Sequence, residues 1–380
     1  MTKYIVTLKP IGSFFFSGEK SFKYDESKKN YFARSNKFPQ QTSILGMIRK
    51  ELLIREGLFK EDGKYENKDK NKIYKLIGKN GFEVGIVKEK IGVIKNLSPV
   101  FIRDGKKYYI SIPKDHKKKD DKKEKNSIYT PISFGEDKIY TSSGEIYLPK
   151  DYVAKDGVSD DFLNIIDESI MPEKKVFLES KRIGITRVID DSSRDNKFYK
   201  QVSYLFNRKD DETKNKDYKF IFELDIDDST LKNNLDGYSN IVSLGAEGTS
   251  FKMDITKNND KSLVTYTKDY LKKLSRKDKY KYKIILLSDT FISEEAAKYI
   301  EYSICSYVNF RYRVRRTQSE KNVSINNYKD FHKTINIKYS LMEKGSVLFT
   351  NSSELVKEIE KQKDYVQIGY NTVLQLGGVQ

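Results

Sequence analysis

Residues 30–53, NYFARSNKFPQQTSILGMIRKELL, join a polar and aromatic segment to a pattern of apolar residues. The apolar side chains in 44–52 recur every three or four residues, which predicts a helix packed on a sheet. Thr42 or Ser43 stands where a helix N-cap is expected. Gly46 costs roughly 1 kcal/mol relative to Ala in a helix interior, so we expect a close contact there. With the strand pattern YIVTL at residues 4–8, the chain is predicted to begin as strand, long loop and helix.

The start of this predicted helix has the chemistry of an anion site. Free N–H groups and the positive end of the helix dipole favour phosphate. Cationic and amide side chains that could add to such a site are Arg34, Lys37, Gln40, Gln41, Arg49 and Lys50. The same residues also suit a capped helix that packs on its own sheet. The sequence leaves both interpretations open.

The composition indicates a globular protein with an anionic partner. The chain has 380 residues, enough for two or three domains, and its 27 Tyr and 21 Phe supply aromatic cores although 33% of it is charged. The formal net charge is +17, which favours a polyanion, with nucleic acid as the first candidate. A Lys-rich surface that only keeps the protein in solution is the alternative, and composition does not separate the two.

The remaining patterns form two groups of strands and helices. The first has a hairpin at 98–113 around Asp104-Gly105 and a half-buried strand at 217–227, followed by a strand region at 240–255. The second has strands at 283–288, 336–341 and 346–349 and helices at 294–305 and 354–361. The charged stretch 61–75 is a predicted solvated insertion, 116–125 is a predicted loop, and 258–279 is the predicted domain boundary.

This order of elements predicts an α+β protein made of two ferredoxin-like, RNA-recognition-type domains with β-hairpin and charged loop insertions. The predicted domains are residues 1–257, with insertions at about 60–80 and 104–200, and residues 280–380.

The sequence offers little for catalysis. His116 lies inside a charge run, and His332 follows a polar loop, so neither stands beside a nucleophile. Cys305 is the single cysteine, and one Cys with two distant His makes no usual zinc ligand set. Phosphate-loop and dinucleotide motifs are missing, and the acidic runs at 225–228 and 190–191 suit turns better than a metal. We expect no catalytic residue, no metal and no cofactor.

The first residues and the hydropathy of the whole chain indicate its cellular location. MTKYIVTLKP is too polar for a signal peptide, and no run approaches the roughly 20 apolar residues that span a membrane. A single cysteine fits a reducing compartment. We expect a cytoplasmic protein without a membrane partner.

Two further segments combine cations with apolar residues. KRIGITR, residues 181–187, brings Lys181, Arg182 and Arg187 around a short apolar pair. FRYRVRR, residues 310–316, would as a strand place three arginines on one face that could follow a phosphate backbone, although an ordinary exposed sheet face is favoured there. We also expect one ring of the run 14–16, FFF, to contact a ligand or partner.

Several motifs, in order along nearly the whole chain, resemble one known family. FFFSGEKSF (14–22) followed by residues 30–53 resembles the start of the third subunit of the type III-B CRISPR Cmr effector complex, in the Cas-five-like branch of the RAMP superfamily. RIGITR followed by FYKQVSYLF (198–206) resembles its middle motif, and SLGAEGTSF (243–251) its glycine-containing strand turn. EKGSVLF (343–349) and GYNTVLQLGG (369–378) resemble its C-terminal motifs.

The resemblance implies two ferredoxin-like domains with a protruding hairpin and no catalytic activity. It implies a subunit that caps the crRNA 5′ handle, beside the large cyclase/nuclease subunit and the backbone RAMP subunit, with target RNA only indirectly in reach. The RNA-binding positions that it implies are Gly18, Arg34, Pro39, Gln40, Gln41, Thr42, Arg182, Gly184 and Arg187. Lys37, Arg49 and Lys181 join them because of their charge and place. The alternatives are a RAMP endoribonuclease that processes precursor crRNA and the equivalent subunit of a type III-A Csm complex.

Overall fold

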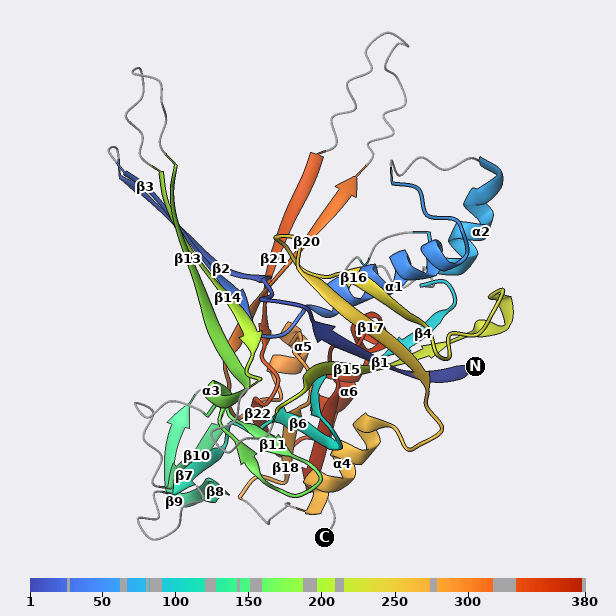
Figure 1. Ribbon diagram of the computed structural model, residues 1–380. Coiled ribbons are helices and arrows are strands. Elements are labelled where there is room, and N and C mark those ends of the chain that lie inside the picture. The colour runs from blue at the N-terminus through green and yellow to red at the C-terminus, as the bar shows by residue number, and fades with distance from the viewer. Residues whose placement is uncertain are drawn as a thin grey trace, which may run out of the picture.

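The computed structural model describes residues 1–25, 28–61, 67–79, 82, 91–119, 128–141, 144–150, 159–186, 197–208, 215–273, 279–316 and 333–377. Within these ranges the chain is an α+β protein with many strands and few helices, as predicted (Figure 1). None of the helices described is both long enough and apolar enough to cross a membrane.

The largest sheet is antiparallel and lies at the centre of the molecule. Its strands run in the order β12-β11-β6-β5-β15-β1-β17-β16, and β4 also pairs with β15. The register places Val6 between Phe222 and Ile255. The bounds are β1 (Thr2–Pro10), β4 (Ile94–Leu97), β5 (Phe101–Asp104), β6 (Lys107–Ser111), β11 (Phe162–Asn164), β12 (Ile170–Met171), β15 (Tyr218–Ile226), β16 (Ser239–Ser243) and β17 (Ser250–Lys257). The strand predicted at 4–8 and the hairpin around Asp104-Gly105 are confirmed.

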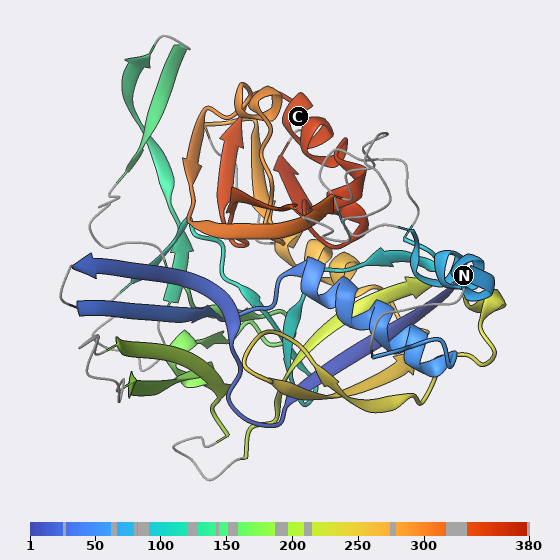
Figure 2. The ribbon, with the colours of Figure 1, turned by 90° about the horizontal axis from the view of Figure 1, so that it is seen from above.

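Both faces of this central sheet are covered. On one face, α1 (Gln41–Arg55) packs Ile44 and Ile48 into the core that contains Phe222, and α2 (Asn67–Ile77) lies beside α1 (Figure 2). On the other face, Ile221 packs against side chains of the C-terminal half. Ile221 and Phe222 point to opposite faces and are both fully buried. The strand predicted at 217–227 is therefore confirmed, but the prediction that it is only half-buried is wrong.

A second sheet projects from the body as an arm (Figure 1). It runs in the order β13-β14-β3-β2, with β14 and β3 parallel. The bounds are β2 (Phe16–Asp25), β3 (Lys28–Asn36), β13 (Phe177–Thr186) and β14 (Lys197–Phe206), and α3 (Glu173–Val176) precedes β13. The long loop predicted between the first strand and helix is wrong, because β2 and β3 form a paired ribbon there. Backbone pairing between β2 and β3, and between β3 and β14, stabilises this ribbon. The ribbon therefore does not need the alternation of apolar and polar residues by which a strand is predicted from sequence.

Three two-stranded ribbons complete the strands outside the C-terminal sheet. They pair β7 (His116–Lys119) with β8 (Ile128–Pro131), β9 (Ser133–Thr141) with β10 (Gly144–Lys150), and β20 (Tyr307–Arg316) with β21 (Lys333–Met342). The predicted loop at 116–125 therefore begins with a strand, because HKKK pairs with IYTP. Residues 120–125 lie outside the described residues.

The C-terminal sheet is antiparallel with the order β19-β22-β18-β23. Along the chain its elements are β18 (Tyr282–Leu286), α5 (Glu294–Ala297), β19 (Tyr302–Ile304), β22 (Val347–Thr350), α6 (Glu354–Glu360), α7 (Lys363–Gln367) and β23 (Val373–Gly377). The helix predicted at 294–305 ends early, because residues 302–304 pair with β22. The predicted boundary at 258–279 contains α4 (Leu263–Lys273), which buries Leu263 and Leu271 in the core beneath the central sheet.

The two halves differ in how they use helices. The C-terminal half follows the order β-α-β-β-α-β of a ferredoxin-like unit. In the N-terminal half, β15 is followed by a 3-10 turn (Asp228–Thr230) and β16 before β17, where such a unit has its second helix. Two ferredoxin-like domains with the predicted boundaries therefore stay a prediction.

Candidate nucleic-acid interface

The start of α1 is occupied by a side chain from the other half of the protein. The amide of Gln41 donates to the Tyr370 hydroxyl at 3.1 Å, and Thr42 lies close to the same hydroxyl. The amide of Ser43 donates to the Gln40 carbonyl at 2.9 Å. Tyr370 is 1% exposed, and its burial raises the pKa of the phenol. The expectation of free amides at this helix start is therefore wrong, because Tyr370 fills the position of the anion.

The glutamines before α1 also bond within the chain. The Gln41 amide group, in a side chain that is 6% exposed, donates to the carbonyls of Ser98 at 3.1 Å and Gly369 at 3.3 Å. Gln40 donates to the Asn309 carbonyl at 3.2 Å, and Pro39 is buried. The set Gln40, Gln41, Thr42, Gly369 and Tyr370 is called the α1 joint below, since it connects the two halves. RNA contact by its members stays a prediction.

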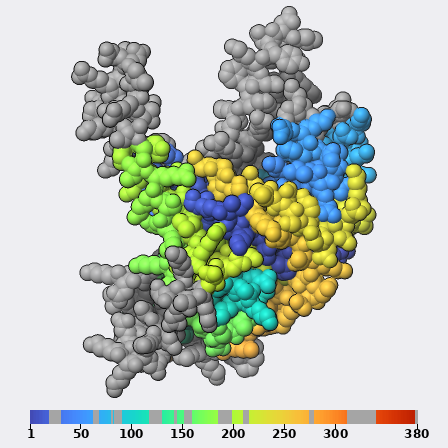
Figure 3. All heavy atoms as spheres, in the orientation of Figure 1, coloured from blue at the N-terminus to red at the C-terminus, as the bar shows by residue number. Residues whose placement is uncertain are grey.

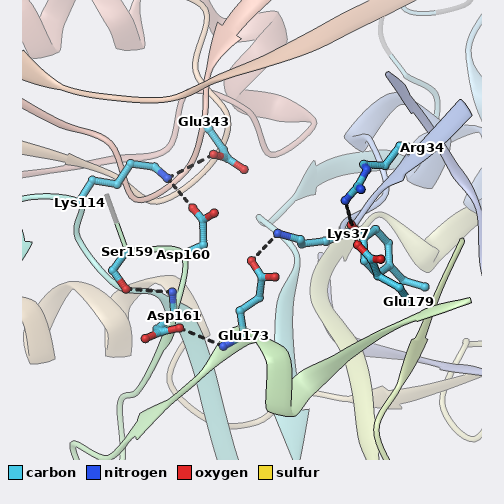
Figure 4. A network of polar contacts seen from close by, with 10 residues as sticks. Arg34, Lys37, Lys114, Ser159, Asp160, Asp161, Glu173, Glu179 and Glu343 are labelled. Carbon is cyan, nitrogen blue, oxygen red and sulfur yellow. Dashed lines mark hydrogen bonds and ion pairs between the residues drawn. The ribbon is translucent and has the colours of Figure 1, made fainter. Parts of the chain in front are cut away.

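A cavity of about 250 Å³ lies beside the α1 joint, and both Arg34 and Lys37 line it. Each of these cations has an acidic partner (Figure 4). Arg34 meets Glu179 at 2.9 Å, and Lys37 pairs with Glu173. Burial opposes the charge of Lys37, but Glu173 outweighs it and raises the pKa of the lysine. These two predicted RNA contacts are therefore already neutralised inside the chain.

A third cation of the cavity, Lys114, links the two halves of the protein. Lys114, whose side chain is almost fully buried, meets Asp160 at 3.1 Å and Glu343 at 3.2 Å (Figure 4). Glu343 belongs to the C-terminal half, so this ion-pair group crosses the same boundary as the α1 joint. The cavity is thus charge-balanced rather than a cationic pocket for phosphate.

Lys344 and Asp289 stand apart from these pairs. Lys344 is partly buried, and the desolvation of its ammonium lowers the pKa of that group to about 7. Its ammonium lies over the Phe38 ring and borders the cavity, while its backbone amide donates to Asp289 at 3.0 Å. Burial raises the pKa of Asp289. Both groups are therefore less charged near neutral pH than they would be in water.

A groove of about 660 Å³ runs along the outer side of α1. Residues of α1, of the turn after β16 and of the start of β2 line it. They are Phe16, Ser17, Gln40, Ser43, Gly46, Met47, Lys50, Ser243, Leu244, Gly245 and Ala246. Figure 3 shows α1 and the β16–β17 region side by side on this face. No described atom lies within 4 Å of a Cβ built on Gly46. The close contact expected at Gly46 is therefore missing within the chain, and the glycine faces an open groove.

Comparison with protein-family models gives a match across nearly the whole chain. A family model described as CRISPR-associated protein (Cas_Cmr3) matches residues 6–377. The chain belongs to this family. The predicted resemblance to the third subunit of the type III-B Cmr complex is thereby confirmed. No curated protein matches the chain.

Two solved structures are similar to this member of the Cas_Cmr3 family. One is a chain from a cryo-EM structure of the type III-B Cmr-beta bound to cognate target RNA and AMPPnP, state 1. It is 14% identical, with 96% of this chain and 94% of that chain covered and a TM-score of 0.44. The other, from the type III-B Cmr-beta bound to cognate target RNA, has the same identity and TM-score with 97% and 95% covered. Both likenesses are distant, and the family assignment rests on the family match.

The arm of this Cas_Cmr3 family member carries the remaining predicted residues. A Cβ on Gly18 would lie 2.5 Å from the Arg34 carbonyl oxygen, so close approach of β3 requires glycine there. Lys181 meets Glu179 at 3.2 Å, and Arg182 is exposed. Gly184 lies under the ring of Tyr199. Arg187 lies outside the described residues.

The other predicted cations and rings are less available. Burial lowers the pKa of Arg49 to about 10, and its Nε has no hydrogen-bond partner among the described residues. FRYRVRR forms β20 as predicted, but the side chains of 311–316 lie outside the described ones. Phe14, Phe15 and Phe16 are all buried, and Phe16 also lines the groove along α1. Contact of one of these rings with a ligand or partner stays a prediction.

The groups considered for catalysis have structural partners or lie outside the described residues. His116 Nδ1 lies 2.8 Å from the buried Asp115, which also pairs with Lys283 of the C-terminal half. Burial opposes the charge of Asp115, but Lys283 and His116 outweigh it and lower the pKa of that carboxyl to about 2. No group of three potential metal ligands occurs in the described part of the chain, and His332 lies outside it.

Proposed function

We propose that this chain is a non-catalytic, crRNA-binding subunit of a type III-B CRISPR ribonucleoprotein in RNA-guided antiviral defence. It caps the crRNA 5′ handle and bridges the large cyclase/nuclease subunit to the backbone subunit, with two ferredoxin-like domains as its frame. Family membership and a net charge of +17 support a guide RNA as partner. The observation that carries the proposal is the groove along α1, in which Gly46 faces open space.

The groove suits a sugar–phosphate backbone better than the α1 joint does. Ser43, Gly46 and Ala246 present only small side chains to the groove, and a Cβ built on Gly46 meets no described atom within 4 Å, so a backbone can approach the helix closely at this point. Lys50 is exposed at its edge and supplies a cation, and the Ser43 hydroxyl supplies a donor. A glycine at position 46 lowers the stability of the helix and makes no packing contact within the chain that would offset this loss. In this proposal, close contact with the bound RNA strand is the reason for the glycine.

Gly46 substitutions separate this role from a structural one. Gly46→Ala should stabilise the free protein by about 0.5–1 kcal/mol, because Ala is the better helix former. Gly46→Leu should fill the groove and weaken binding of a crRNA several-fold without unfolding the helix. Gly12→Leu is the matched control, since Gly12 also has no atom within 4 Å of a built Cβ and lies outside the groove. If Gly46→Leu binds crRNA as tightly as the native chain does, the groove is not the RNA-binding site.

Handle recognition is tested by titration of the full chain with a crRNA and with the same RNA carrying a scrambled 5′ handle. The affinity should be higher for the native handle, and it should fall with salt by a slope of about −0.7 per neutralised phosphate. Equal affinity and a flat salt response would contradict handle binding.

The proposal of a non-catalytic chain is supported at His116, which the Asp115 carboxylate and the Pro113 carbonyl both engage. Incubation of the pure chain with precursor crRNA in the absence of metal should leave the RNA intact. Specific cleavage that is lost in His332→Ala would replace the proposal with the endoribonuclease alternative.

A further inference from the structure

One tyrosine on the arm lies flat against a glycine. Tyr199 of β14 stands directly opposite Gly184 of β13 in the register. A Cβ on Gly184 would collide with Cε1, Cζ and the hydroxyl oxygen of Tyr199. The phenol ring therefore extends across the glycine backbone in place of a side chain. Tyr199 is nevertheless 41% exposed, so the ring face away from Gly184 is open to solvent.

The neighbours of this ring on the same face are polar or aromatic. Arg182 lies two residues before Gly184 and therefore on the same face of β13. Its guanidinium is exposed and has no ion pair or hydrogen bond within the described part of the chain. Gln201 stands opposite Arg182, and Tyr31 stands beside Tyr199 on β3. An open aromatic face next to an available cation is the arrangement with which proteins hold single-stranded nucleic acid.

We propose that Tyr199 stacks on a base of single-stranded RNA and that Arg182 binds a phosphate next to that base. This inference rests on the proposed function, since it requires that the chain binds RNA. A protein partner fits this face less well, because stable protein interfaces bury about 800 Å² per partner and a single ring between Arg182 and Gln201 offers far less. The groove reaches the arm only at Phe16 and Ser17, at the start of β2, whereas the register places Tyr199 level with Phe22 further along the arm (Figure 1). The base held by Tyr199 therefore belongs to a different nucleotide from the one in the groove.

Gly184 has a defined part in this site. It lets the Tyr199 ring lie down on the strand, which fixes the ring plane before a base arrives. A side chain at position 184 would lift the ring without removing any group that touches RNA. The glycine predicted as an RNA contact thus acts as a positioning residue for Tyr199.

The chain contains no tryptophan, so Tyr199→Trp places a single indole fluorophore at the proposed site. Titration of this full-length variant with oligo(rA) should quench the indole fluorescence, because a stacked base contacts the ring. An abasic strand of the same length, which keeps the phosphates, should not quench it. Tyr140→Trp is the matched control, since Tyr140 is 80% exposed on β9 and stands outside the arm.

Affinities for oligo(rA) complete the test. Tyr199→Leu should bind about ten-fold more weakly, Tyr199→Phe should bind like the native chain, and Gly184→Ala should resemble Tyr199→Leu. Native affinity in Tyr199→Leu, together with no quenching in Tyr199→Trp, overturns this inference while RNA binding stands. Absence of oligo(rA) and crRNA binding by the native chain overturns the proposed function as well.

Discussion

The α1 joint and the arm both carry residues that the sequence marks for RNA, yet the fold uses them in different ways. In the α1 joint, the backbone amide of Gln41 donates to Tyr370, and its side-chain amide nitrogen donates to the carbonyls of Ser98 and Gly369. On the arm, Arg182 is exposed and the Tyr199 ring has one open face. The same residue types therefore hold the halves together at one place and are available to a ligand at the other.

The difference teaches that a cation or amide near a helix start is not evidence of a ligand until its partners are known. Arg34 and Lys37 lie close to α1, but Glu179 and Glu173 neutralise them. Each acidic partner comes from a segment more than 130 residues further along the chain. Local sequence around 30–53 holds no sign of either.

The largest expected effect is loss of stability at the α1 joint. Tyr370→Ala should cost about 3–5 kcal/mol, because it empties a fully buried aromatic position that packs against Phe310 and Tyr365. Tyr370→Phe should cost about 1 kcal/mol, because only the hydroxyl at the start of α1 is lost. Urea unfolding followed by far-UV circular dichroism measures both.

The Tyr370→Phe variant also sharpens the comparison with the arm. Its crRNA affinity should equal that of the native chain under conditions where both are folded, because the ring still closes the helix start. A marked change in RNA affinity, with little change in stability, would show that the start of α1 contacts RNA. The α1 joint would then be a ligand-binding region like the arm.

A smaller effect is expected at Lys344, beside the α1 joint. Its pKa falls from the model-compound value of 10.5 to about 7 in the folded state, so the unfolded chain binds more protons between these values and stability should rise with pH there. Lys344→Met removes the buried ammonium and should stabilise the protein at pH 6 by at least about 1.4 kcal/mol, the equivalent of one pKa unit. This gain should shrink as pH rises from about 7 toward 10.

Urea unfolding of the native chain and Lys344→Met across that pH range measures the effect. Asp289, Glu343, Lys114 and Lys37 all face Lys344, so the Glu343→Gln variant serves as a control for their influence. A gain that does not depend on pH would show that packing, rather than the charge of Lys344, sets the stability.

Strong periodicity of apolar residues was sufficient to predict several helices and strands of the fold. The apolar spacing in 44–52 predicted α1, and the alternation in 217–227 predicted β15, because burial in each case follows the period of the element. The same alternation failed to show that β15 is covered on both faces, since Glu223 is buried with hydrogen bonds from Ser262 and Asn258. A buried polar residue with long-range partners looks like a solvent-facing residue in sequence.

The arm and the candidate site were harder to predict for the same reason. FSGEKSFKYD and KKNYFARSN form strands because they pair with each other and with β14, which comes more than 150 residues later. The sequence predicted a close contact at Gly46, but it did not show whether the chain itself or a ligand makes that contact. Tyr199 was passed over because its significance depends on the cross-strand position of Gly184, which only the register shows.

The smallest expected effect on stability, and the one that separates the two regions most directly, comes from the cations of the arm. The double variant Lys181→Ala/Arg182→Ala should change the free energy of unfolding by less than about 0.5 kcal/mol, because both side chains are exposed. Its affinity for single-stranded RNA should nevertheless fall several-fold, and the salt slope should become shallower by about 0.7 for each lost phosphate contact. Lys357→Ala/Lys361→Ala on α6 removes the same charge from an exposed helix of the other half and should leave the salt slope unchanged. An equal drop in both double variants would mean that RNA responds to net charge alone, and the arm would then be no more an RNA surface than the rest of the basic exterior.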